Sequence, residues 1–310
     1  MAGWTRESAV GEALGIRQTA LSRRRRIAPV LRLALLPLGS WSGRFAIFVL
    51  AAVVLVAAVA PALAPYDPLA NHFDAAGQLL RLDPPSARYK LGTTYYGLDV
   101  LSQLIYGTRI VLVVGITCAV LIGVIGTNVG LVAGYYGGRV DGLLMRLTDL
   151  AFGIPFLPFV VMLVALLRPS LWNTIVAISM LMWRTSARVI RSQVLSLRER
   201  GFVRAARIAG ASDLRILYVH IFPNVLPMVL LYVAFDIAYA VLAEASVSFL
   251  GFGDPNQVSW GQMLYLAYVS GSIRQAWWWT LPPGLAISLF VIAVFLVGRN
   301  YERLTNPRLR

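Results

Sequence analysis

The sequence predicts an all-α membrane protein with six transmembrane helices and with its N and C termini on the cytoplasmic side. Of its 310 residues, 58% are hydrophobic and only 14% are charged, whereas average globular proteins carry about 25% charged residues. Six long runs contain no charged residue, and the basic residues are spread unevenly over the segments between them. These three observations exclude an ordinary soluble domain.

The six uncharged runs predict where the chain crosses the membrane. They span residues 45–66, 110–138, 150–167, 169–183, 216–235 and 275–298. Most of them reach the roughly 17–25 residues that a helix needs to cross a hydrocarbon core of ~30 Å. The fourth run has only 15 residues, so the span that it forms must include polar or charged residues at its cytoplasmic end.

The distribution of the basic residues predicts the orientation of these spans. With both termini inside the cell, the cytoplasmic segments hold eight basic residues in 1–44, two in 139–146, eight in 184–215 and four in 299–310. Six remain for the outer side, namely Arg81, Arg88, Lys90, Arg109, Arg168 and Arg274. An excess of Lys and Arg in cytoplasmic loops sets the orientation of membrane proteins. The net charge of +14 is therefore a topology signal and does not predict nucleic-acid binding.

The residues that metal and nucleotide chemistry require are nearly absent. The single cysteine, Cys118, excludes a disulfide framework, and the two histidines, His72 and His220, stand in no metal-binding motif. Lys90 is the only lysine, and it does not stand in the Gly-x-x-x-x-Gly-Lys-Ser/Thr motif of a phosphate-binding loop. We therefore expect no catalysis and no cofactor in this chain. If it takes part in active transport, the ATP is bound by another polypeptide.

Taken in order, the chain divides into five regions. A cytoplasmic arm (1–44) includes four consecutive arginines that suit anionic lipid headgroups, and it is too long for an ordinary cleaved signal peptide. The first span (45–64) is followed by an extracytoplasmic lobe (65–108), in which turn-forming residues predict an ordered docking surface or a cap on the bundle. Five further spans (109–299) and a short cytoplasmic tail (300–310) complete the chain.

Glycines and prolines predict the packing of the second and third spans. Glycines in the second span, several of them four residues apart, would let neighbouring helices approach closely. Pro155 and Pro158 predict a bend in the third span, which serves either helix packing or gating.

A basic loop (192–223) between the fourth and fifth spans predicts a short amphipathic helix. One face holds Phe202, Ala205, Ala206 and Ala209, and the other holds Arg200, Arg204 and Arg207. We expect Gly210 to end this helix and Ser212 or Asp213 to cap the next one. An elbow of this kind fits a groove on a partner protein, but its arginines suit lipid headgroups equally well.

Four segments in the same order resemble the second-type (DppC/OppC-like) membrane subunit of the peptide branch of ABC importers, which serves dipeptides, oligopeptides and nickel. The first two are residues 63–70 and 91–109. The third is the basic loop, in which the Ala205-Ala206 pair, Gly210 and residues 220–223 carry the likeness. The fourth is residues 244–253 together with 259–261. The likeness covers almost all of residues 45–310. It implies a type I importer permease of the MetI-like fold in the bacterial inner (plasma) membrane.

The resemblance also implies a set of partners for a non-catalytic permease. These are a homologous permease subunit, two cytoplasmic ATPase subunits that use ATP and Mg, and an extracytoplasmic solute-binding protein that delivers di- or oligopeptides or a similar small solute. Membrane lipid surrounds the complex, and nucleic acid is not a partner. Carried over by position, the ATPase-coupling residues are Gly201, Phe202, Arg204, Ala205, Ala206, Arg207, Gly210, Ala211 and Ser212. Arg204 stands where the family often has glutamate, which implies a partner surface that is acidic or tolerates arginine.

Two carboxylates within the fifth span, Asp236 and Glu244, are candidates for the translocation path. Carboxylates are costly inside a membrane and are functional candidates there. Their offset of eight residues places them within about 80° on a helix of 3.6 residues per turn, so both can face one cavity. Asp236 would pass a cationic group or pair with a neighbouring subunit, and Glu244 would line the path or make an anchoring hydrogen bond.

Two other functions remain open from the residues alone. The first is a stand-alone channel or proton-coupled carrier that uses Asp236 and Glu244 as a relay. The second is a membrane-anchored protein whose arginines bind nucleic acid or lipid, although the sidedness of those arginines argues against nucleic acid. Purification of the chain with or without ATPase subunits distinguishes the first of these from the importer.

Overall fold

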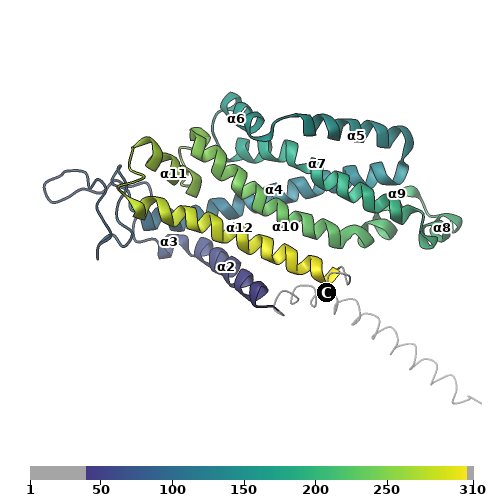
Figure 1. Ribbon diagram of the computed structural model, residues 1–310, viewed down its shortest axis with the longest axis horizontal. Coiled ribbons are helices and arrows are strands. Elements are labelled where there is room, and N and C mark those ends of the chain that lie inside the picture. Colours follow the sequence, from purple (N-terminus) through teal and green to yellow (C-terminus); the bar gives the residue numbers. More distant parts are fainter. Residues whose placement is uncertain (1–39, 306–310) are drawn as a thin grey trace, which may run out of the picture.

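The computed structural model describes residues 40–305, which form an almost wholly helical structure (Figure 1). In chain order the elements are α2 (Trp41–Ala58), α3 (Ala60–Leu63), α4 (Val100–Tyr136), α5 (Gly138–Gly153), α6 (Phe156–Leu167), α7 (Leu171–Arg198), α8 (Gly201–Ile208), α9 (Asp213–Arg215), the π-helix η2 (Ile216–Ile221), α10 (Phe222–Val247), the π-helix η3 (Ser248–Phe252), α11 (Trp260–Val269) and α12 (Trp277–Thr305). The predicted all-α class is confirmed. Most of the predicted arm and the end of the predicted tail lie outside the described residues.

The long helices lie side by side along the long axis of the molecule, with α4 at the centre (Figure 1). Helix α4 packs against α7 on one side and α10 on the other, α10 packs against α12, and α12 packs against α2. The lobe consists of residues 64–99, between α3 and α4, because residues 100–108 of the predicted lobe belong to α4. It lies at one end of this bundle, and α8 lies at the opposite end. We call these the lobe end and the α8 end.

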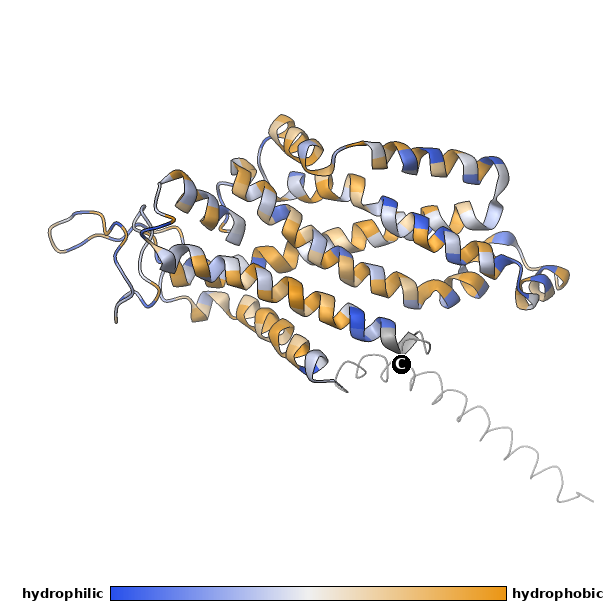
Figure 2. Cartoon of the chain, in the orientation of Figure 1, coloured by the Kyte–Doolittle hydropathy of each residue, from blue (hydrophilic) through white to orange (hydrophobic). Residues whose placement is uncertain are grey.

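Length and composition support four membrane spans, or five, rather than all six that the sequence predicts. The four are Trp41–Ala58, Val100–Tyr136, Asp213–Phe252 and Trp277–Glu302, and the bent pair α5 and α6 is the fifth if it counts as one span. The predicted fourth span lies in α7, which is a continuous helix of 28 residues. Its second half carries Arg184, Arg188, Arg191 and Arg198, so its composition does not mark it as a span. Figure 2 shows hydrophobic residues along α2, α4, α10 and α12, and hydrophilic ones on α5 and α7.

Three glycines of α4 let α7 approach closely, as the four-residue spacing predicts. A Cβ atom added at Gly126 would lie 2.8 Å from the Trp183 carbonyl oxygen, and one at Gly130 would lie 2.6 Å from that of Ala187. At Gly134 the added atom would lie 2.7 Å from the Cβ of Val194. These separations are shorter than real Cβ contacts, so the α4–α7 interface depends on the missing side chains.

The predicted bend of the third span is a break. Helix α5 ends at Gly153, Pro155 adopts extended backbone just before α6, and the two helices meet at 86°. Proline cannot donate the hydrogen bond that would continue α5 and restricts the residue before it. Helix α6 therefore folds back over α7, while α5 runs alongside it (Figure 1).

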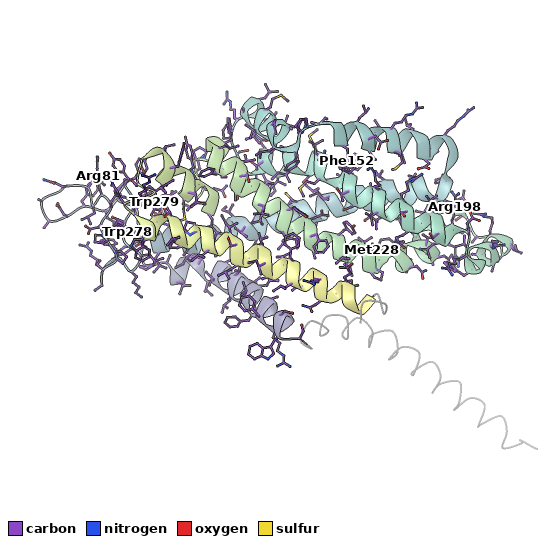
Figure 3. All side chains as sticks on the ribbon, viewed as in Figure 1. Arg81, Phe152, Arg198, Met228, Trp278 and Trp279 are labelled. Carbon is purple, nitrogen blue, oxygen red and sulfur yellow. The ribbon has the colours of Figure 1, made fainter. Side chains whose placement is uncertain are left out.

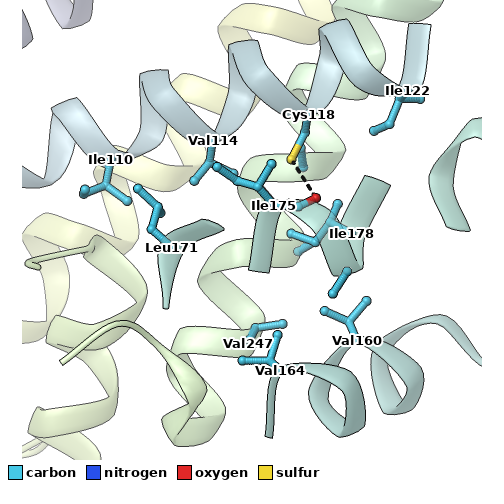
Figure 4. Close-up of a cluster of buried hydrophobic side chains, with 13 residues drawn as sticks. Ile110, Val114, Cys118, Ile122, Val160, Val164, Leu171, Ile175, Ile178 and Val247 are labelled. Carbon is cyan, nitrogen blue, oxygen red and sulfur yellow. Dashed lines mark hydrogen bonds between the residues drawn. The ribbon is translucent and has the colours of Figure 1, made fainter. Parts of the chain in front are cut away.

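A buried hydrophobic cluster joins α4, α6, α7 and α10 near the middle of the bundle (Figure 4). Cys118 is fully buried in this cluster, with its sulfur 3.8 Å from the Ile175 carbonyl oxygen. Val160 and Val164 of α6 pack into the same cluster. The cluster fixes α6 against α7 and α10, and these three helices also line a cavity that is described below.

The lobe is ordered by its own hydrogen bonds and by contacts with the helices. Asp99 caps α4, because its carboxylate accepts hydrogen bonds from the backbone nitrogen and the hydroxyl of Ser102 at 2.8 and 2.6 Å. The Trp278 indole donates to the Thr93 carbonyl oxygen at 3.3 Å. Arg81, Trp278 and Trp279 lie together at this end of the molecule, far from Arg198 (Figure 3).

Candidate functional site

Helix α8, at one tip of the bundle, is attached through a single buried side chain. Val203 is fully buried, whereas no other residue of α8 is. It belongs to a hydrophobic cluster that includes Ile216, Leu217 and Ile221 of η2. Val203 is not among the residues of the apolar face that the sequence predicts. Val203 and Ala206, which also packs against this cluster, are three residues apart and so share one helix face.

The remaining apolar residues of this tip point outward. Of the face predicted from the sequence, Phe202, Ala205 and Ala209 are exposed, and only Ala206 is half-buried. The most exposed large hydrophobic side chain of the tip is Ile208, at 88%, and Leu214 of α9 follows at 66%. The tip thus presents exposed apolar side chains, with Phe202 and Ile208 outside the candidate spans and Leu214 at the start of one, which is typical of a site that another molecule covers.

The turn after α8 requires glycine for its backbone conformation. Gly210 has a φ of +79°, and no atom lies within 4 Å of a Cβ built there. The backbone nitrogen of Ala211 donates to the Ala206 carbonyl oxygen at 3.0 Å, which is the closing bond of a Schellman motif. Gly210 follows the end of α8, where the sequence predicts that it ends the helix, and glycine is needed there for the left-handed conformation of the backbone.

The predicted caps of the next helix do not act through their side chains. Ser212 precedes α9 and makes no side-chain cap, although its carbonyl oxygen accepts a 2.9 Å hydrogen bond from the Ile216 nitrogen. The carboxylate of Asp213 instead accepts a 2.7 Å hydrogen bond from the hydroxyl of Tyr135, at the end of α4. Arg198 donates to the Gly134 carbonyl oxygen at 3.1 Å. Both contacts fasten the α8 region to α4.

The arginines of α8 differ in what they contact. The guanidinium of Arg207 lies 6.0 Å from the centre of the Tyr135 ring. The guanidinium of Arg204 donates to the backbone oxygen of Glu199 at 3.0 Å. Gly201, the first residue of α8, is exposed, and a side chain there would meet no atom within 4 Å. Arg204 therefore folds back onto the end of α7, and the surface around Gly201 is open.

A cavity of about 680 Å³ lies between α6, α7 and α10 in the middle of the bundle. Its polar lining residues are Arg184, Thr185, Tyr232, Asp236, Tyr239 and Ser246. Phe156, Leu157, Met182, Phe235, Leu242 and Ala243 supply the apolar part of the wall. A cavity that combines a mostly apolar wall with a few polar groups is the usual form of a small-molecule site.

Asp236 and Arg184 place opposite charges on the wall of this cavity. Asp236 is 5% exposed, and it accepts a 3.3 Å hydrogen bond from the Ser186 hydroxyl of α7. Arg184 does not pair with it. Its guanidinium donates to the Ala151 carbonyl oxygen and lies 4.8 Å from the centre of the Phe152 ring of α5. Arg184 directly follows the fourth uncharged run (169–183), whose shortness predicts a polar or charged residue within that span, but its place on a cavity wall was not predicted.

The other arginines of this face bind α5. Arg188 pairs with Asp149 at 2.6 Å, and Arg191 makes two hydrogen bonds to the carboxylate of Asp141. Arg184, Arg188 and Arg191 therefore lie on the face of α7 that contacts α5. Its charges are used mainly to hold two helices together.

Glu244 lies two turns beyond Asp236 on α10 and is not among the residues that line the cavity. It is 4% exposed, and its carboxylate accepts a 2.6 Å hydrogen bond from the hydroxyl of Ser248 at the start of η3. Ser248 in turn packs closely against Gly253 and Gly261. Glu244 thus holds the turn between α10 and α11, and the two carboxylates do not face one cavity.

Comparison with known proteins gives a family match. Residues 126–310 match the family model described as the binding-protein-dependent transport system inner membrane component. The chain is also similar to individual relatives over most of its length. It is 36% identical over 265 residues to the di/tripeptide transport system permease protein DppC of Pseudomonas aeruginosa (strain UCBPP-PA14), which covers 83% of this chain and 85% of that protein.

Two further relatives show a similar degree of likeness. The dipeptide transport system permease protein DppC of Haemophilus influenzae is 35% identical over 265 residues, covering 83% of this chain and 88% of that protein. The nickel transport system permease protein NikC of Escherichia coli (strain K12) is 36% identical over 272 residues, covering 87% of this chain and 95% of that protein. Proteins with different solutes in their names therefore match this chain equally well.

Proposed function

Because the chain belongs to the family of inner membrane components of binding-protein-dependent transport systems, we propose that it is one of two membrane subunits of an ATP-driven importer of di- or oligopeptides. The family consists of ABC transporter permeases, which are non-catalytic, multi-pass subunits of the plasma membrane. The homologous second subunit, two ATPases that use ATP and Mg, and an extracytoplasmic binding protein complete the proposed complex.

The observation that carries this proposal is the construction of the α8 tip. A short helix is held from behind by Val203 and by the Tyr135–Asp213 hydrogen bond, and it presents Phe202, Ile208 and Leu214 outward. This exposed surface fits a groove on an ATPase, and the rigid attachment passes the movement of that ATPase to α4. In the proposed importer the α8 end lies in the cytoplasm together with both termini, and the lobe end lies outside.

The cavity between α6, α7 and α10 is the part of the translocation path that this chain contributes. Peptides carry an ammonium group and a carboxylate, and the cavity offers Asp236 to the first and Arg184 to the second. Neither charged group pairs with the other, which leaves each available to a solute. The second membrane subunit closes the open side of this cavity.

A proton-coupled carrier with an Asp236–Glu244 relay is less well supported. The carboxylate of Glu244 is occupied by Ser248, and Glu244 does not line the cavity that Asp236 borders. A relay would need both carboxylates on a common aqueous path.

Co-purification tests the proposal. The chain, affinity-tagged and expressed with the genes beside its own, should be recovered with a second membrane subunit and two ATPase subunits per complex. Liposomes that contain this complex should take up a labelled dipeptide only when ATP is inside the liposomes, on the side of the ATPases, and the binding protein is outside. Recovery of the chain alone, with uptake driven by a proton gradient, would overturn the importer in favour of the carrier.

A further inference from the structure

A second hollow, separate from the solute cavity, opens between α2, α4 and α12. Its volume is about 510 Å³. It is lined by one stripe from each helix, which includes Ala52 and Val56 of α2, Leu104 and Ile105 of α4, and Leu289 and Phe290 of α12. The lining positions of each helix repeat after three or four residues, as in Ala52 and Val56 of α2, so each helix turns one face to the hollow. We call it the α2 groove.

The wall of the α2 groove offers almost no polar group to an occupant. The hydroxyl of Thr108 already donates to the Ile105 carbonyl oxygen at 2.6 Å. The indole nitrogen of Trp260 donates to the Leu104 carbonyl oxygen at 3.0 Å. Lys90 is the single charged residue that lines the groove. Its side chain is exposed and makes no ion pair with another described residue. An occupant therefore needs a long apolar part and an anionic group at one end.

The position of the groove fits one leaflet of the bilayer. The groove residues of α4, from Leu101 to Thr108, lie within its first nine residues beyond the lobe and span eight positions, and those of α2 run from Phe48 to Val56. Eight residues of helix rise about 12 Å, which is close to half of a hydrocarbon core of ~30 Å. Lys90 belongs to the lobe, so the charge lies where lipid headgroups begin.

The floor of the groove is a specific feature of the chain. Trp260 lies so close to α4 that a Cβ atom added at Gly107 would be 2.4 Å from its ring. The tryptophan is 2% exposed. Its indole therefore forms the part of the wall that lies against α4.

We propose that the α2 groove binds an anionic phospholipid of the outer leaflet, with one acyl chain between α2, α4 and α12 and its phosphate at Lys90. The assignment to the outer leaflet rests on the orientation given under the proposed function. The absence of any acid from the lining and the presence of one cation favour an anionic headgroup. The solute cavity, with its six polar residues, differs in chemistry and lies between other helices.

Lipid binding is tested on the purified intact complex in nanodiscs, with phosphatidylglycerol that carries a photoreactive group in one acyl chain. The groove-filling variant Ala52→Trp is compared with Ala51→Trp, because Ala51 is exposed on the same helix and does not line the groove. We expect cross-links to peptides of α2 and α12, and their loss in Ala52→Trp but not in Ala51→Trp. Equal cross-linking in the two variants would show an ordinary lipid annulus and would overturn the proposal.

The headgroup is tested by native mass spectrometry of lipid retained after detergent exchange. Lys90→Gln should reduce the retention of phosphatidylglycerol about fivefold, the effect of one basic residue beside an anionic lipid surface, whereas Arg88→Gln should not. Phosphatidylethanolamine should be retained less than phosphatidylglycerol by the unaltered protein. In the cross-linking experiment of the preceding paragraph, cross-links to another subunit in place of α2 and α12 would also overturn the proposal. These readouts do not need ATP hydrolysis, so they remain valid if the chain proves not to couple to an ATPase.

Discussion

The hydroxyl of Tyr135 donates a 2.7 Å hydrogen bond to the carboxylate of Asp213 and so joins the end of α4 to the start of α9. Helix α4 has 37 residues and is capped at its other end by Asp99. At a rise of 1.5 Å per residue it is about 55 Å long, so one rigid element reaches from the lobe to the α8 tip. The hydrogen bond lies where force on α8 would enter that element.

Removal of this hydrogen bond should weaken coupling more than folding. Tyr135→Phe keeps the ring and its packing but leaves Asp213 without its donor. Hydrogen bonds to charged groups are worth about 1.5–3 kcal/mol, and the exposure of Asp213 places this one at the low end, so we expect about a tenfold loss of ATP-driven uptake with normal protein levels. Tyr136→Phe is the matched control, since Tyr136 is the exposed neighbour. Equal uptake by the two variants would contradict the role of the bond.

Gly210→Trp should abolish ATP-driven uptake while the protein still inserts into the membrane. The φ of +79° strains any side chain at this position, by about 1–2 kcal/mol for a left-handed residue, and an indole would also protrude from the surface on which we propose that an ATPase docks. Gly271→Trp is the control, because Gly271 has a φ of +70° with equally open space but lies between α11 and α12. Co-purification of the ATPases should be lost only in the first variant. Retention in both would mean that α8 is not the docking element.

The family and the helical class could be predicted from the sequence because hydropathy and loop motifs are local properties. The glycine spacing of α4 and the bend at Pro155 were equally readable, since both act through backbone geometry. The α8 face was harder to predict. Val203 is buried because η2 and the end of α7 happen to enclose it, and periodicity in eight residues cannot distinguish a face turned to the bundle from one turned outward.

The surroundings of Asp236 and Glu244 were likewise not predictable from helical periodicity. A separation of eight residues predicts one side of a helix, but Asp236 meets the cavity beside α6 and α7, whereas Glu244 meets Ser248, where the helix turns into η3. Arg184 was missed as a cavity residue because the 86° break between α5 and α6 decides which part of α7 is covered. Such long-range packing has no local signature.

Asp236→Asn should reduce the uptake of peptides with a free amino group more than that of N-acetylated peptides. The substitution removes the negative charge from the cavity wall but keeps its shape and the contact with Ser186. A lost charged hydrogen bond predicts about a tenfold rise in the concentration needed for half-maximal uptake. Glu244→Gln changes a carboxylate outside the cavity and should affect both peptide types alike. If Asp236→Asn leaves the preference between the two peptides unchanged, the carboxylate does not meet the solute.

The α4–α7 contact should be the most sensitive helix interface to small side chains. Gly130→Ala would bring a Cβ atom to 2.6 Å from the Ala187 carbonyl oxygen, whereas Gly284→Ala in α12 would meet no atom within 4 Å. Both changes replace a helical glycine by alanine, and this replacement by itself stabilises a helix by about 1 kcal/mol. The difference in stability between the two variants therefore reports the α4–α7 contact alone. Overpacking predicts a destabilisation of about 1–3 kcal/mol for Gly130→Ala alone. The melting temperature can be followed with a thiol-reactive fluorescent dye, since Cys118 is the only cysteine and is fully buried until the bundle opens. A Gly130→Ala protein that melts at or above the temperature of the Gly284→Ala protein would show that α7 can withdraw from α4 without cost.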